Sequence, residues 1–242
     1  MKLLLTVAHP DDEAFGCGSV LAHAASRGVE SVVACATRGE LGEMAGLAAG
    51  EQTPANLGEI REAELRQATS LLGVSRVELL GWLDSGTTGE PAPGSLVAAD
   101  PSEVEAAVAA LIEAEKPDVV VTIDASDGHR DHAVIRDATL AALTRTTWRP
   151  MRTYLWCLPR SLLAGFAGVP GLGTPDEDIT TWVDVSAHLD LRWTAMRAHA
   201  SQSPPYDSMT PEVAHAFLAT DCLLRIDPPW TGGPVERDWI PD

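Results

Sequence analysis

Residues 3–13, LLLTVAHPDDE, join an apolar run to a cluster of charged side chains. The run from Leu3 to Ala8 has the length and composition of a strand that is buried on both faces. One histidine, one proline, two aspartates and a glutamate follow it directly. Charged groups at the end of a buried strand must be paired or bound to a metal. The stretch therefore predicts a central strand that brings a polar cluster to one edge of a sheet.

Apolar runs and helical patterns alternate along the rest of the chain. Short apolar runs predict further strands at 31–36, 77–80, 119–123, 153–158 and 180–185. Helical patterns predict helices at 12–27, 59–72, 102–116, 131–144, 187–200 and 211–220, with Ser102 and Glu105 forming a capping box. This alternation is typical of an α/β fold. We expect a single Rossmann-like domain over residues 1–242, with a mostly parallel sheet and helices on both faces.

Polar side chains follow four of the predicted strands. Parallel α/β sheets bind ligands outside the carboxyl ends of their strands, so these side chains should meet at one edge. They are His9, Asp11 and Asp12 after the first strand, Arg38 and Glu40 after the second, Asp84 after the third, and Asp124, Asp127, His129, Asp131 and His132 after the fourth.

Two of these clusters, AHPDDE (8–13) and DGHRDH (127–132), offer a metal site. His9 and Asp12 can face one ion from a tight turn, and either His129 or His132 completes two histidines and one carboxylate. Three protein ligands with one open position are typical of catalytic zinc, and ferrous iron suits the same set. Alternatively, the aspartates cap a helix and the histidines lie at the surface. The placement of both clusters at one sheet edge favours the metal.

The composition excludes several kinds of partner. The formal net charge is -18, from 35 acidic and 17 basic residues, which disfavours nucleic acid and anionic membranes. The four cysteines are widely spaced and predict neither disulfides nor a structural zinc site. The first apolar run is too short for a signal peptide, and no stretch reaches transmembrane length. We expect a cytoplasmic protein that acts on a small molecule, with the oligomeric state left open, a homo-oligomer included.

AHPDDE followed by DGHRDH resembles the LmbE-like (PIG-L) superfamily of zinc-dependent N-deacetylases, which act on N-acetylglucosamine-containing compounds. Weaker motifs follow in the family's order over residues 3–202: TRGELGE (37–43), REAEL (61–65) leading to LGV (72–74), DSG (84–86) and HASQ (199–202). The resemblance implies that His9, Asp12 and His132 are zinc ligands and that Asp11 is the general base. It implies that His129 is the general acid or an electrostatic partner. It also implies that Arg61 and Asp84 contact sugar hydroxyls. Glu13, Glu40 and His199 receive no role.

One position departs from the resemblance. Some family members have a tyrosine two residues before the histidine that matches His129, and this chain has Asp127 there. A carboxylate would repel a developing oxyanion, so we expect Asp127 to hydrogen-bond His129 and favour its protonated form instead. Neither Tyr154 nor Tyr206 lies near the motif in sequence.

The resemblance implies a zinc-dependent hydrolase that removes an N-acetyl group from an amino sugar or its conjugate and releases acetate. Two alternatives remain open. The same site could cleave a larger acyl group, as in an amidase acting on mycothiol conjugates. The chain could also bind a sugar or metal without turnover, although Asp11 beside a ligand set argues against this because binding alone needs no base.

Overall fold

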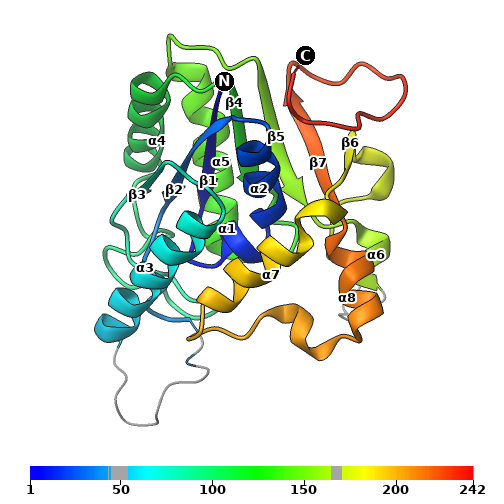
Figure 1. Ribbon diagram of the computed structural model, residues 1–242. Helices are drawn as coiled ribbons and strands as arrows, with labels where there is room; N and C mark the ends of the chain where they lie inside the picture. Colours follow the sequence, from blue (N-terminus) through cyan, green and yellow to red (C-terminus); the bar gives the residue numbers. More distant parts are fainter. Residues whose placement is uncertain (43, 45–53, 165–170, 242) are drawn as a thin grey trace.

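The computed structural model describes residues 1–42, 44, 54–164 and 171–241 (Figure 1). In this part of the chain, one seven-stranded sheet has the order β3-β2-β1-β4-β5-β7-β6. The strands are β1 (Lys2–Val7), β2 (Glu30–Cys35), β3 (Arg76–Leu79), β4 (Val119–Ile123), β5 (Arg152–Cys157), β6 (Thr181–Asp184) and β7 (Thr220–Asp227). The first five strands pair in parallel, whereas β7 runs antiparallel to both β5 and β6. The predicted α/β fold with a mostly parallel sheet is confirmed.

The strand order reverses at β1, which pairs with β2 on one side and with β4 on the other. Successive strands first build outward from β1 through β2 to β3, and later strands build outward in the opposite direction. The crevice at the carboxyl ends of the strands at such a point is where open α/β sheets bind ligands. The segments that follow β1 and β4 are AHPDDE and DGHRDH. The topology thus brings the two predicted clusters together.

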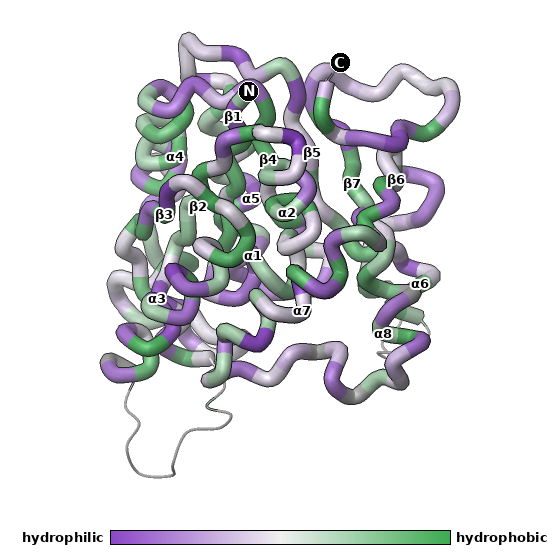
Figure 2. Tube along the Cα trace, in the orientation of Figure 1, coloured by the Kyte–Doolittle hydropathy of each residue, from purple (hydrophilic) through white to green (hydrophobic). Residues whose placement is uncertain are grey.

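Helices cover both faces of the sheet (Figure 1). On one face, α4 and α5 pack against each other and against β1, while α2, α3 and α7 form the layer on the other face. The helices are α1 (Asp12–Phe15), α2 (Gly18–Ser26), α3 (Pro54–Leu71), α4 (Pro101–Glu115), α5 (Arg130–Arg145), α6 (Arg160–Ala164), α7 (Leu189–Ala198) and α8 (Pro211–Leu218). Between these layers, strands β1 and β4 are almost completely buried, and Figure 2 shows the mixed hydrophobic and hydrophilic character of the helices around them.

The helix predicted for residues 12–27 is two helices, α1 and α2, separated at Gly16 and Cys17. The backbone at Gly16 approaches its neighbours closely. A Cβ there would lie 2.9 Å from the carbonyl oxygen of Asp12 and 3.2 Å from the ring of Trp156. The end of α1 therefore packs tightly against β5. The sequence pattern of residues 12–27 could not show this contact, because β5 lies far away in the sequence.

Two further details differ from the sequence prediction. Helix α4 begins at Pro101, and Asp100 caps it by accepting a hydrogen bond from the Ser102 backbone N–H, so the predicted Ser102 capping box is wrong. Proline favours the first helical position, which moves the cap upstream. Strand β7 was not predicted, because it follows α8 directly and owes its place to the exposed edge of β5.

The described cysteines are all buried and none forms a disulfide, as expected from their spacing. No helix in the described ranges is both long and apolar enough to cross a membrane.

Candidate metal centre and active site

Asp12 is fixed at the first turn after β1. Its Oδ2 accepts hydrogen bonds from the backbone N–H groups of Ala8 and His9, at 3.1 and 2.8 Å. The other oxygen, Oδ1, lies 3.2 Å from Nε2 of His132. Although burial opposes it, the neighbouring His132 and His9 hold the pKa of Asp12 well below its usual range. The backbone thus orients an ionised carboxylate toward the histidines.

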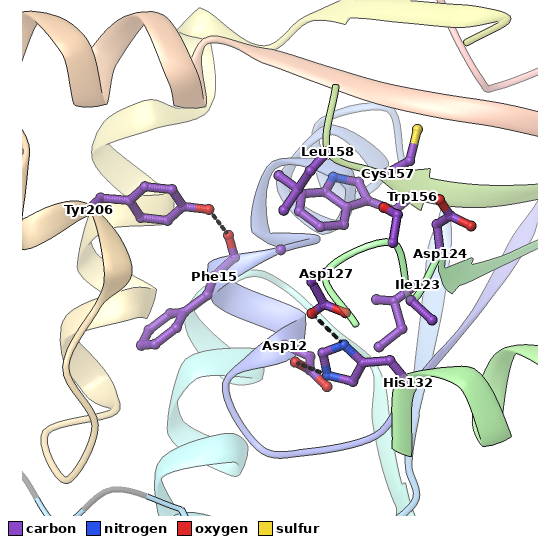
Figure 3. A pocket seen from close by; sticks show the side chains of 13 residues that line it. Asp12, Phe15, Ile123, Asp124, Asp127, His132, Trp156, Cys157, Leu158 and Tyr206 are labelled. Atoms are coloured by element: carbon purple, nitrogen blue, oxygen red, sulfur yellow. Dashed lines mark hydrogen bonds and ion pairs between the residues drawn. The ribbon is translucent and has the colours of Figure 1, made fainter. Parts of the chain in front are cut away.

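His132 lies between two carboxylates (Figure 3). Its Nε2 faces Asp12, and its Nδ1 lies 2.7 Å from Oδ2 of Asp127. Asp127 also accepts a hydrogen bond from the backbone N–H of His129 at 3.0 Å. The predicted pairing of Asp127 with the imidazole of His129 is therefore wrong, because the first turn of α5 directs His132 toward Asp127.

His9 has the same arrangement from the opposite side. Its Nε2 lies 3.1 Å from Oδ2 of Asp131 and 3.6 Å from Oδ1 of Asp84, while its Nδ1 lies 3.7 Å from Asp12. Asp131 is completely buried and also accepts the backbone N–H of Ser85. Sequence reasoning gave Asp131 no role. The signal in the sequence was its place among the polar side chains that follow the fourth predicted strand, which were expected to meet at one edge of the sheet.

The donor atoms suit a metal ion. Nitrogen atoms of His9, His129 and His132 all lie within 4.8 Å of one another, and Asp12 adjoins two of these rings. Histidines that bind metals usually donate their second ring N–H to a carboxylate, which here is Asp131 for His9 and Asp127 for His132. Although burial opposes it, the surrounding carboxylates raise the pKa of His9 to about 9. The cluster thus favours positive charge, as a cation site should.

His129 begins helix α5 and differs from the other two histidines. Its Nδ1 accepts a hydrogen bond from the backbone N–H of Asp131 at 3.2 Å, which caps the helix. Its ring lies edge-on to that of His9, with centroids 4.6 Å apart. Burial, together with the nearby His9 and His132, lowers the pKa of His129. Because Nδ1 is occupied as an acceptor, the neutral form of this imidazole has its proton on Nε2, where it can donate a hydrogen bond.

Asp11 stands next to the cluster in a rare backbone conformation, with φ 119° and ψ -30°. Such geometry costs a residue other than glycine about 1–3 kcal/mol and is concentrated at functional sites. Its Oδ2 lies 2.9 Å from Nη2 of Arg61, and 18% of its side chain remains exposed. Burial raises the pKa of the Asp11 carboxyl to about 6, against the opposing effect of Arg61. A carboxylate with this pKa is ionised at neutral pH and can accept a proton.

Arg61 and Asp84 are hydrogen-bonded to protein groups in the structure, and their contacts to sugar hydroxyls stay a prediction. Arg61 is only 3% exposed and donates to Asp11 and to the carbonyl oxygens of Gly39 and Pro10. A Cβ on residue 39 would overlap the Arg61 guanidinium, which explains why the TRGELGE segment has a glycine at this position. Glu43 of the same segment lies outside the described residues. Asp84 is 5% exposed and accepts from the backbones of Leu41 and Gly86. Both side chains orient the site from within.

Two hollows flank the cluster. One, of about 200 Å³, reaches Asp12 and His132 and is lined by apolar side chains that include Trp156 and Leu158 (Figure 3). Tyr206 also lines it, so tertiary structure brings this tyrosine to the site although the sequence separates it from both motifs. The other, of about 420 Å³, lies beside Asp84 between the loops after β2 and β3.

The fold and site together define an α/β protein with a candidate metal centre at the point where its strand order reverses. The family model described as PIG-L, GlcNAc-PI de-N-acetylase, matches residues 4–143, and the chain belongs to this family.

One relative and two solved structures illustrate the similarity. The chain is 35% identical to a 1D-myo-inositol 2-acetamido-2-deoxy-alpha-D-glucopyranoside deacetylase of Mycolicibacterium vanbaalenii, over 94% of this chain and 88% of the relative. N,N'-diacetylchitobiose deacetylase of Pyrococcus horikoshii superposes with a TM-score of 0.68 at 18% identity, covering 93% of this chain and 83% of that one. The 4-carboxy-2-hydroxymuconate hydratase of Pseudomonas putida superposes with a TM-score of 0.70 at 21% identity, covering 96% and 99%. These two structures share the fold, and their different reactions show that the fold does not decide the chemistry.

Proposed function

We propose that this protein is a metal-dependent hydrolase that removes the N-acetyl group from an amino-sugar conjugate, with residues 1–242 acting as one domain. One arrangement carries the proposal: the Asp11 carboxylate, held by Arg61, directly precedes Asp12 and interacts electrostatically with it and with the histidine cluster that suits a metal. The 35% identity to a deacetylase of an inositol-linked N-acetylated sugar supports the substrate class. Of the substrates that this site could take, we favour an N-acetylglucosaminyl group linked to a polyol.

His9, Asp12 and His132 are the residues that would hold the metal. Two histidines and one carboxylate match catalytic zinc, and ferrous iron suits the same ligands. When bound, such an ion acts as a Lewis acid that acidifies water and polarises a carbonyl group. Asp131 and Asp127 hold the rings of His9 and His132, respectively, in the orientation that ligation needs.

Asp11 and His129 perform the proton transfers and stabilise charge in this proposal. Asp11 accepts a proton from the attacking water, because it is ionised, partly exposed and held by Arg61. His129 donates a hydrogen bond from Nε2 to the oxygen of the tetrahedral intermediate, because its Nδ1 is occupied as an acceptor. The leaving amine takes up the proton that Asp11 received. The products are acetate and a free amino sugar.

Acetate release from a panel of amides tests the proposed reaction. We expect turnover of N-acetylglucosaminyl conjugates and little turnover of N-acetyl amino acids, because the relative that is 35% identical is named as a deacetylase of such a conjugate. A preference for long-chain N-acyl sugars would identify an amidase instead. Absence of turnover across the panel by metal-loaded protein would overturn the proposal in favour of a binding protein.

Metal analysis tests the ligand set. After dialysis, His9→Ala, Asp12→Ala and His132→Ala should each retain well under half of the metal bound by the unaltered protein, because each removes one of three donors. His215→Ala, which replaces an exposed histidine on α8, is the matched control and should keep its metal. Full retention in all three variants would contradict the assignment. Metal loss in His129→Ala instead would make His129 a ligand.

A further inference from the structure

The backbone of Asp11 needs an external restraint. Its φ of 119° lies in a region that residues with a Cβ rarely adopt, and Asp11 does not cap α1 with its own side chain. A strained conformation of this kind persists only where the surrounding structure holds it. The contacts that surround Asp11 therefore show which residues maintain its geometry.

Glu13 provides the contact to the Asp11 backbone. The Glu13 side chain is fully buried, and its Oε2 accepts the backbone N–H of Asp11 at 2.9 Å. Its other oxygen, Oε1, lies 2.6 Å from Nε2 of His199. A buried carboxylate needs such partners, and both of its oxygens have one. Glu13 thus links the proposed base to a histidine 186 residues further along the chain.

His199 is itself held in place at the end of α7. The ring of Phe15 packs edge-on against it, with centroids 5.8 Å apart. Two residues later, Ser201 donates from its backbone N–H and its hydroxyl to Glu64 on α3, at 2.8 and 2.6 Å. The same helix carries Arg61, which contacts the Asp11 carboxylate. Asp11 is therefore fixed at its backbone through α7 and at its side chain through α3.

We propose that Glu13 and His199 are positioning residues for the reaction: His199 orients Glu13, and Glu13 holds the Asp11 backbone so that its carboxylate faces the metal centre. The inference rests on the proposed function, since it concerns the base of that reaction. It gives the REAEL and HASQ segments a shared purpose, because both anchor Asp11. A pair that served only to hold α7 in place would act on stability and not through Asp11.

Replacing His199 separates these two roles. His199→Ala removes the donor, His199→Phe keeps the ring volume without it, and His199→Gln keeps a donor. We expect kcat to fall about 10- to 100-fold in the Ala and Phe variants, because small displacements of a reacting group are costly. KM and metal content should stay unchanged, and the Gln variant should recover part of kcat. His215→Ala is the control. A normal kcat in folded, metal-loaded His199→Phe overturns the inference.

Combining the change with Asp11→Asn tests whether the pair acts through Asp11. The residual kcat of Asp11→Asn should not fall further when His199→Phe is added, because residues that act as one unit are non-additive. An equal further loss overturns the positioning role. If Asp11→Asn alone retains a normal kcat, the assignment of Asp11 as the general base in the proposed function is contradicted.

Hydrogen exchange provides a readout without turnover. In metal-loaded His199→Ala, the backbone amide of Asp11 should exchange faster than in the unaltered protein and in His215→Ala. Unchanged exchange there would contradict the proposed restraint even if no substrate were known.

Discussion

Asp11→Asn should bind metal normally and lose about 100- to 10,000-fold in kcat, the usual effect of removing a general base. The amide cannot accept a proton from water, yet its oxygen can still accept the hydrogen bond from Arg61, so the local structure should survive. The ligand Asp12 is untouched by the change. The measurement is kcat for an N-acetylglucosaminyl conjugate, with the metal content determined on the same sample.

Asp137→Asn is the matched control for this experiment. Asp137 lies on the exposed side of α5, where it pairs with Arg136, and its replacement should leave kcat unchanged. Near-normal kcat in metal-loaded Asp11→Asn would remove Asp11 from the mechanism. Loss of metal in that variant would instead make Asp11 part of the ligand set.

His129→Asn should lower kcat by about 100- to 1,000-fold with little change in KM, as expected when a donor to an oxyanion is removed. Asparagine is chosen because its side-chain oxygen can still cap α5 in place of the imidazole Nδ1, so the helix start is preserved. The shorter side chain cannot present a donor where Nε2 stands. Steady-state kinetics on metal-loaded protein give both constants.

His215→Asn makes the same substitution at an exposed position and should leave both constants unchanged. A rise in KM without a change in kcat would assign His129 to ground-state binding of the substrate. Asp127 cannot take over the stabilisation of the oxyanion, because its carboxylate is anionic and can only accept hydrogen bonds; it pairs with His132 instead. His129 is thus the side chain on which that role rests in our proposal.

The sequence by itself determined the strand–helix alternation and the parallel core of the sheet. Continuous apolar runs such as Val119–Ile123 can only be buried on both faces, and that requires helices on both sides. It also placed the polar clusters that follow β1 and β4 at one edge of the sheet, with His129 and His132 both open as the partner of His9 and Asp12. These conclusions depend on local periodicity and on general rules of topology.

Only the tertiary structure decided which partner each polar group has. Asp127 contacts His132 and not the ring of His129, because the rotation of the first turn of α5 selects between them. Arg61 and Asp84 are buried and hydrogen-bonded to protein groups that lie far from them in the sequence. Strand β7 likewise depends on the edge supplied by β5, and it provides in turn the edge on which β6 pairs. Such contacts join residues far apart in sequence, where no local pattern carries a signal, so packing alone sets them.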